Sequence, residues 1–504
     1  DAITLASVPS SPLFRYPYCS LHSIIFSFLG VFVRLFGGHH FVGFCIQRTT
    51  RTVMTAPFKD TAPGDVSPSV PQEVLDYILD FLHDDAPTLR TCSLVCHALL
   101  PCSRYHIYSN VFIVHKGELD EFREQYAGQL YHCENLATLL KNYPHVAPLV
   151  TRFGIHANSM MSEILMEISL VPIIKSLHNL SHVEFVARQY QGFWTDFPVA
   201  RRKVFLAALR SVPLKTFISN GITYQGNKQF RDVFTAAANP ALKHLSIVTD
   251  NGADWTSENY PPIRPPPKGL PALESLTMAG AATCSNIAWM FFSQSLYNIS
   301  SVHHLSLQMY YENNASLVQR LLNAMQGSLE YFILDVNAWT DQQVRLDLSR
   351  LRSLSSFFMI LASPLDSRLL RVRLSPTLRT LKIEQVCHNW EHSLDQSVHA
   401  WAQFDAHLDA LPLPALQCVH IRLHDSSHGT CYCFACHARE HGVCKCFLCY
   451  KDKYPCTICH GREHPTEYVG WKRQVEDKMP LLKARGILEV ELVKRRYCIQ
   501  RTFD

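Results

Sequence analysis

A run of cysteines near the end of the chain has the spacing of a metal site. Eight of the eighteen cysteines lie between positions 431 and 459, in two C-x-C-x-x-C phrases and one C-x-x-C pair. Two thiolates across a tight turn chelate zinc tetrahedrally, and eight thiolates fill two such sites. We therefore predict structural zinc on Cys431, Cys433, Cys436, Cys444, Cys446, Cys449, Cys456 and Cys459, with His437, His441, His460 and His464 as reserve ligands.

Three other interpretations of these cysteines are open. A flexible insertion with free thiols, or with occasional disulfides, is the plainest. A RING finger fits poorly, because its cross-braced pairs require a longer interval than separates Cys436 from Cys444. A catalytic zinc would need an open coordination position beside a carboxylate base such as Glu440 or Glu463, whereas so many thiolates favour closed sites.

The rest of the chain lacks the common catalytic motifs. The sequence contains no phosphate-binding loop, H-E-x-x-H, G-x-S-x-G or dinucleotide-binding glycine pattern, so we predict no catalytic residues and no enzyme activity. Hydrophobic residues at 47% and charged residues at 18% indicate a globular chain, and a net charge of +4 is too small to imply nucleic-acid binding. The only cofactor expected is structural zinc.

The stretch from 70 to 110 has the pattern of short amphipathic helices. Pro71 suits a helix start, Asp85 suits the cap of a second helix, and Pro101 stops or kinks that second helix. Two or three helices of this size cannot bury all their apolar surface, which indicates docking on another protein, although an ordinary hairpin packed in its own domain has the same pattern. The predicted apolar stripes contain Pro71, Leu75, Ile78, Leu79 and Leu82, then Leu89, Cys92, Val95, Cys96 and Leu99.

The same stretch resembles the F-box of fungal proteins, the module through which substrate receptors join SCF-type ubiquitin ligases. The order Val70-Pro71, Glu73, Ile78, Leu82, Asp84, Leu89, Cys92-Ser93, Val95-Cys96 carries the resemblance, and the run from Ser103 to Tyr108 resembles the end of that module. Val70 replaces the usual Leu, and Leu99 stands where Trp is frequent. The resemblance implies a Skp-type adaptor bound by the stripes, a cullin-based ligase and an unidentified protein substrate as partners, and a cytoplasmic or nuclear location.

Beyond position 110, one strand-like phrase returns every 24 to 38 residues: an apolar residue, two others, an apolar residue, one other, an apolar residue. One strand and one helix per unit indicate a degenerate leucine-rich-repeat-like solenoid over 145–425, although an α/β sheet of another topology fits the same pattern. The phrases are Val150/Phe153/Ile155, Leu180/Val183/Phe185, Leu242/Leu245/Ile247, Leu273/Leu276/Met278, Val302/Leu305/Leu307, Leu329/Phe332/Leu334, Leu378/Leu381/Ile383 and Leu416/Val419/Ile421, with looser copies at Leu214/Phe217 and Leu354/Phe357.

The expected fold class is therefore α/β, with a small all-helical F-box at 70–110, the solenoid, a Cys/His-rich insertion at 426–464 and a terminal helix-strand cap at 465–504. Pro480 predicts a break in the cap helix, and Gly486 its end before a strand at 487–492. The apolar run from Leu21 to Gly38 is interrupted by Arg34, and its unbroken part falls short of the usual membrane span of about 20 residues. We therefore expect residues 1–53 to lie outside the functional fold, with 54–69 a polar leader and no membrane partner; a membrane anchor is the alternative.

Replacing Cys456 and Cys459 with Ser should remove roughly one zinc equivalent, because two ligands of a four-ligand site are lost. Metal analysis of the reduced, purified chain measures this loss. A wild-type protein without zinc, with all eight thiols open to alkylation under native conditions, would instead show a flexible cysteine-rich loop.

Overall fold

The computed structural model describes most of the chain between positions 71 and 493. Segment 1–53, the leader 54–69, Val70 and the eight cysteines between 431 and 459 lie outside the described residues, so the predictions made for them stay predictions. The chain divides into two compact units, 1–70 and 71–504, and only the second contains described residues. These are residues 71–119, 130–157, 161–187, 192–224, 227–249, 269–280, 283–293, 296–309, 315–336, 346–361, 372–387, 390–425 and 467–493.

The second unit is built on a thirteen-stranded sheet in which every pairing is parallel. From β3 onward its order follows the chain, and β1 and β2 end the other edge in the order β3-β1-β2. The strands are β1 Asn110–Val114, β2 Leu130–Tyr131, β3 Arg152–Ala157, β4 His182–Ala187, β6 Thr216–Asn220, β8 His244–Val248, β9 Ser275–Ala279, β10 His304–Met309, β11 Tyr331–Val336, β12 Ser356–Leu361, β13 Thr380–Cys387, β14 Cys418–Asp425 and β15 Leu488–Val493. A separate parallel pair is formed by β5 Gly192–Phe193 and β7 Ile222–Thr223.

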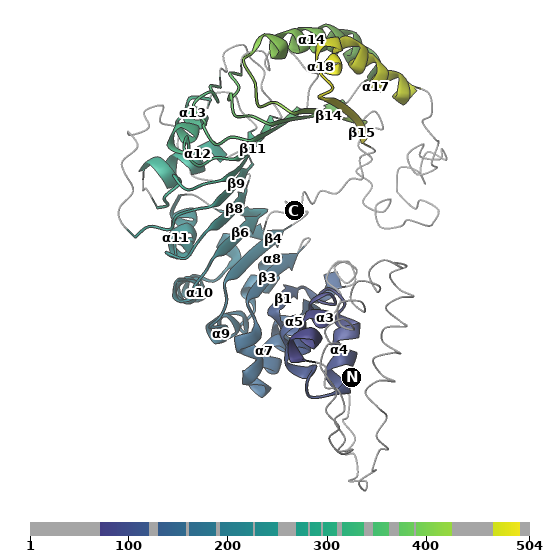
Figure 1. The fold of residues 1–504 in the computed structure, drawn as a ribbon. Helices are drawn as coiled ribbons and strands as arrows, with labels where there is room; N and C mark the ends of the chain where they lie inside the picture. The colour runs from purple at the N-terminus through teal and green to yellow at the C-terminus, as the bar shows by residue number, and fades with distance from the viewer. Residues whose placement is uncertain are drawn as a thin grey trace, which may run out of the picture. The chain divides into compact units, whose positions relative to one another are not determined.

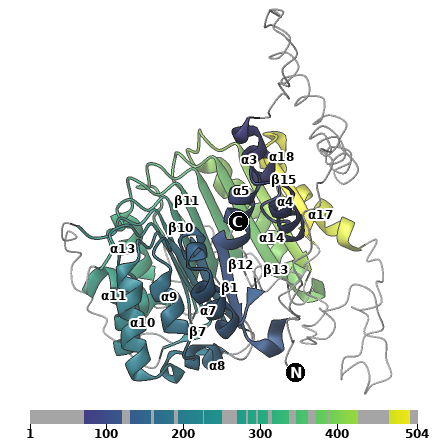
Figure 2. The ribbon, with the colours of Figure 1, turned by 90° about the horizontal axis from the view of Figure 1, so that it is seen from below.

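Helices between the strands line one face of this sheet (Figures 1 and 2). Parallel neighbours require a crossover on every return, and these helices lie on those crossovers for which the structure describes a helix before β14. They are α7 Cys133–Asn142, α8 Met161–Met166, α9 Leu170–Ser176, α10 Val199–Ser211, α11 Asn227–Ala237, α12 Thr283–Ile287, α13 Ala315–Ala324 and α14 Trp390–Ala410. Shorter turns of helix are η1 Lys116–Glu118, η2 Pro144–Leu149 and η3 Trp194–Asp196, and a π-helix, η4 Ala288–Ser293, follows α12.

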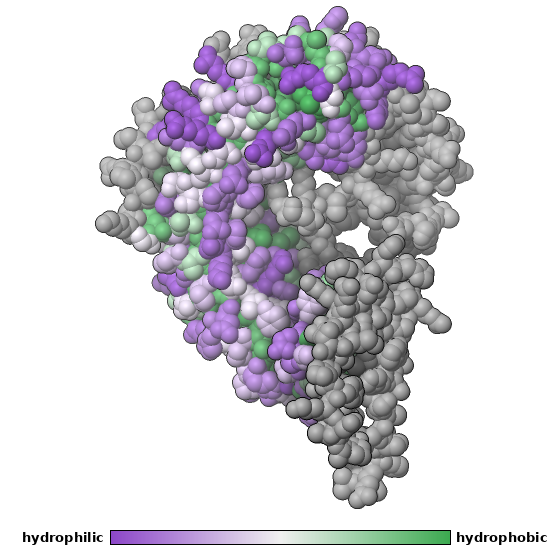
Figure 3. All heavy atoms as spheres, viewed as in Figure 1, coloured by the Kyte–Doolittle hydropathy of each residue, from purple (hydrophilic) through white to green (hydrophobic). Residues whose placement is uncertain are grey.

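All ten predicted strand phrases are strands, so the α/β prediction is confirmed at the level of a mixed fold with a long parallel sheet. Phe332 and Leu334 of β11 and Leu329 just before it, for example, are fully buried in the core. One continuous apolar core runs from Val111 to Val490. Hydrophilic side chains cover much of the outer surface in Figure 3, with smaller apolar patches between them.

The end of the described chain matches the prediction for the cap. Helix α17 Glu467–Lys478 stops at Met479, and α18 Pro480–Ala484 begins on the expected proline. The Asp405 carboxylate of α14 accepts hydrogen bonds from the backbone N–H groups of Leu481 (2.9 Å) and Leu482 (3.0 Å). These bonds satisfy two first-turn N–H groups of α18 that have no acceptor within their own helix.

A buried ionic cluster lies on β3 and β4, on the sheet face away from the helices. The Glu184 carboxylate accepts hydrogen bonds from Arg152 (2.9 Å), His156 (2.8 Å) and His182 (3.3 Å). Burial alone would raise the pKa of Glu184, but the hydrogen bonds from the two histidines and the charges of His156 and Arg152 hold it far below its usual range. Gly154 leaves room for the cluster, because a Cβ there would lie 2.9 Å from Glu184 Oε1.

Glu184→Gln should destabilise the second unit by on the order of 2–4 kcal/mol at neutral pH, because it leaves Arg152 and two histidines without a carboxylate. A depressed folded pKa gives stability that is fully present above the unfolded pKa of about 4.3 and is lost as pH falls toward the folded value. The gap between wild type and variant should therefore narrow below about pH 4.

Thermal unfolding across this pH range measures the gap. Glu274→Gln, which removes an exposed carboxylate paired with Lys243, is the matched control and should leave the unfolding temperature unchanged. Equal unfolding temperatures for Glu184→Gln and the control would show that the Glu184 carboxylate does not stabilise the fold.

Candidate functional site

Three short helices precede the sheet and form what we call the helical module: α3 Gln72–Asp80, α4 Ala86–Val95 and α5 Leu100–Ser109. In Figure 1 they lie together beside β1. Asp85 caps α4 as predicted, since its carboxylate accepts hydrogen bonds from the Thr88 N–H (3.0 Å) and hydroxyl (2.6 Å). Helix α5 leads directly into β1 at Asn110, so the module is joined to the sheet without a linker.

The prediction for the end of the second helix was wrong. Helix α4 ends at Val95, and Cys96 has an extended backbone, with φ at −157° and ψ at 163°. Leu99 is the N-cap of the next helix, and Pro101 lies in the first turn of α5, where a missing N–H breaks no hydrogen bond. Pro101 therefore begins a third helix rather than stopping the second.

The structure divides the ten residues predicted to bind an adaptor. Leu79, Leu82, Leu89 and Cys92 are buried and form the module's interior with Ala86 and Ile107, apart from the continuous core of the repeats. In this conformation the side chains of these four residues are covered by the module itself. Pro71, Ile78 and Val95 are exposed, while Leu75, Cys96 and Leu99 are half-buried.

Helix α3 carries a second apolar stripe that sequence reasoning missed. Val74, Tyr77, Ile78 and Phe81 follow the i, i+3, i+4, i+7 spacing of one helical face, and all four are exposed, Tyr77 at 59% and Ile78 at 44%. The rings of Tyr77 and Phe81 meet edge to face with centroids 4.8 Å apart, which holds them as one surface. We call these four residues the outer stripe.

Exposed apolar side chains concentrate on this module. Of thirteen exposed large hydrophobic residues in the described ranges, seven lie between Val74 and Tyr105. Helix α4 contributes Leu94, which is 87% exposed, and the neighbouring Val95. Exposed apolar side chains gathered on one small module mark a protein interaction site more often than scattered single residues do. The spacing of the outer stripe was visible in the sequence, but nothing there showed which face of α3 is turned inward.

The strand register places a second candidate surface on the sheet face away from the helices. Side chains alternate between faces along a strand, so residues paired across neighbouring strands form rows. One row is polar and rich in histidine: Arg152, His182, Thr216, His244, Ser275 and His304. Burial is the main cause that lowers the pKa of His244 in the middle of this row.

The same face becomes ionic toward β15. Arg422 of β14 lies 3.0 Å from Glu491 and 3.6 Å from Glu384. Lys382 lies over the ring of Phe358, with 4.9 Å from its Nζ to the centroid, and burial together with Arg422 lowers its pKa. This surface therefore offers both charges and an aromatic ring, which suits a polar protein partner.

No protein-family model matches this chain, and a search of curated proteins found no relative. Of the helices within the described ranges, none is both long enough and apolar enough to span a lipid bilayer. The candidate interaction surfaces are therefore the helical module and the polar rows of the sheet.

Leu89→Ala should loosen the helical module, because a fully buried leucine truncated to alanine costs about 2–5 kcal/mol. Leu94→Ala removes the same atoms from the same helix at an exposed position, and should change nothing. Amide hydrogen exchange over residues 72–109 reports the difference. Similar exchange in the two variants would show that Leu89 does not support the module's interior.

Proposed function

We propose that the chain is the substrate-recognition subunit of an SCF-type ubiquitin ligase. The helical module docks on a Skp-type adaptor, and the repeat domain holds a protein substrate for enzymes that bind elsewhere in the complex. The exposed outer stripe of α3 is the observation that carries this proposal. The apolar side chains of the outer stripe agree with the F-box resemblance of residues 70–108, which implies an apolar contact with a Skp-type adaptor.

The size of the module supports a docking role. Its interior is small, and α3 presents apolar residues on two sides: Leu75, Leu79 and Leu82 on the inner side and the outer stripe on the other. A helix that is apolar on two sides is usually covered on both. A partner that buries about 100 Å² of additional apolar surface there gains about 2.5 kcal/mol from this term alone.

The substrate surface belongs to the repeat domain. A long parallel sheet with helices on one face presents side chains in rows on its other face. Such a surface suits the recognition of another protein. The ionic pairs of Arg422 and the histidine row give that face fixed polar groups rather than an apolar groove. The substrate is therefore a protein whose contact surface is polar.

Two other functions stay as alternatives. A scaffold with the same module would bind the adaptor without delivering a substrate for ubiquitin transfer, and recovery of the adaptor without cullin from cells would favour it. A zinc enzyme would depend on the cysteines between 431 and 459, which lie outside the described residues. Metal-dependent hydrolysis by the purified chain would favour that function.

Ile78→Asp should weaken adaptor binding by about a hundredfold, because it places a charge in a surface that loses water on docking. Titration of the full chain with a purified Skp-type adaptor measures the affinity. Ile168→Asp is the matched control, since Ile168 is 73% exposed and lies outside the module, between α8 and α9.

The control should bind the adaptor like wild type. Wild-type affinity for Ile78→Asp, in a chain whose hydrogen exchange shows a folded module, would remove the outer stripe from the interface. No binding by wild type would remove the proposed function itself.

A further inference from the structure

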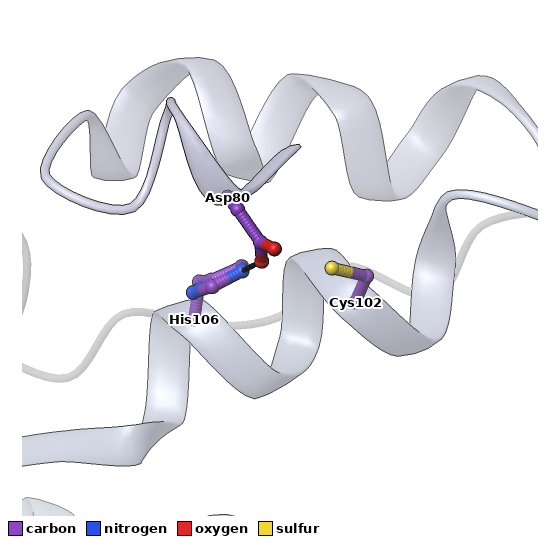
Figure 4. A group of neighbouring side chains, drawn as sticks. All are labelled: Asp80, Cys102 and His106. Atoms are coloured by element: carbon purple, nitrogen blue, oxygen red, sulfur yellow. Dashed lines mark hydrogen bonds and ion pairs between the residues drawn. The ribbon is translucent and has the colours of Figure 1, made fainter. Parts of the chain in front are cut away.

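Three side chains with different metal-binding atoms meet between α3 and α5. The ligand atoms of Asp80, Cys102 and His106 all lie within 4.8 Å of one another. Asp80 comes from the last turn of α3, while Cys102 and His106 are four residues apart on one face of α5. Figure 4 shows the Asp80 carboxylate directed at the His106 ring, with the Cys102 side chain one turn along the same helix.

The helices already hold these groups in place. His106 Nε2 and Asp80 Oδ1 are 2.9 Å apart, and the Cys102 thiol donates to the backbone oxygen of Asp76 at 3.8 Å. Asp76 lies one turn before Asp80 on α3. Asp80 from α3 therefore meets Cys102 and His106 from α5 where the two helices pack together.

Access and distance both suit an ion. The side chain of His106 is 12% exposed and that of Asp80 is 61% exposed, so the group is anchored on α5 and open to water on the α3 side. Bonds of 2.0–2.3 Å in a tetrahedral zinc site set ligand atoms roughly 3.3–3.8 Å apart. Small side-chain rotations therefore close the present spacing without movement of either helix.

We propose that Asp80, Cys102 and His106 form a zinc site that ties α3 to α5, with water as the fourth ligand. Thiolate, imidazole and carboxylate together are a donor set that zinc prefers, whereas magnesium and calcium take oxygen ligands alone. Binding displaces the thiol proton of Cys102 and the hydrogen bond between Asp80 and His106. The site is separate from the cysteines at 431–459, and it exists whether or not the module binds an adaptor.

Zinc analysis of the full chain tests the site directly. Wild type and three variants, Cys102→Ser, His106→Ala and Asp80→Asn, are dialysed against the same free zinc and their zinc content is compared. Each of the first two should contain one zinc equivalent less than wild type. The difference counts this site alone, because the cysteines at 431–459 are unchanged in all four proteins.

Matched controls separate ligation from general effects. His97→Ala and Asp84→Asn change exposed residues of the same types in the same module, and each should keep the wild-type zinc content. Asp80→Asn keeps an acceptor for His106 at an exposed position and removes a carboxylate ligand, so it tests the site without disturbing the module's interior. It should weaken zinc binding by roughly tenfold or more.

A second readout is local to one thiol. Zinc added to the metal-free chain should slow the alkylation of Cys102, which peptide mass spectrometry measures. Zinc should not slow this alkylation in His106→Ala. The alkylation of Cys96 in the same sample is the internal control. Equal zinc content in wild type and all three variants, with alkylation of Cys102 unchanged by zinc, would overturn the proposal. Adaptor binding does not enter either measurement, so this outcome is distinct from failure of the proposed function.

Discussion

The parallel backbone ladder between neighbouring units is the constraint on which the rest of the structure depends. A single strand-helix unit leaves one face of its strand and one side of its helix without apolar cover, so no unit is stable alone. Pairing in register solves this problem along the whole domain. Leu305 of β10, for example, pairs with Leu276 on one side and Phe332 on the other, and all three are buried. A shift by one residue would turn that buried row outward.

The same register decides what the domain offers to a partner. Once the apolar row faces the helices, the alternate positions face the other side. Near β3 and β4 those positions hold a buried carboxylate with three cationic or hydrogen-bonding neighbours, and near β14 and β15 they hold more open ion pairs. The stability of the sheet and the chemistry of its open face are therefore carried by alternating residues of the same strands.

Helix α3 shows the same division on a smaller scale. Leu79 and Leu82 fill the module's interior, whereas Ile78 and Phe81, the residues just before them in sequence, belong to the exposed outer stripe. The module is attached at α5, where the Ser109 carbonyl accepts a hydrogen bond from the Thr151 N–H (3.0 Å) just before β3. A partner bound to the outer stripe would therefore be held on a module that is continuous with the sheet.

The repeated strand phrase made most of the sheet predictable, because buried parallel strands need the same apolar spacing in every unit. Strands β1 and β2 were not predicted, because β1 is a continuous apolar run from Val111 to Val114 without the spacing of the phrase, and β2 has only two residues. Ile78 was grouped with Leu75 and Leu79 because a helical wheel places them near one another, yet tertiary packing turns Ile78 outward. The meeting of Asp80 with Cys102 and His106 could not be predicted either, because it depends on how α3 and α5 pack.

The central claim is that the outer stripe of α3 is a docking face for a Skp-type adaptor. Hydrogen exchange of the full chain, with and without saturating purified adaptor, tests it most directly. The account predicts slower exchange across residues 72–81 and in α4, with the strands β8 to β12 unchanged. Complex formation that leaves exchange in α3 and α4 unaltered would contradict it.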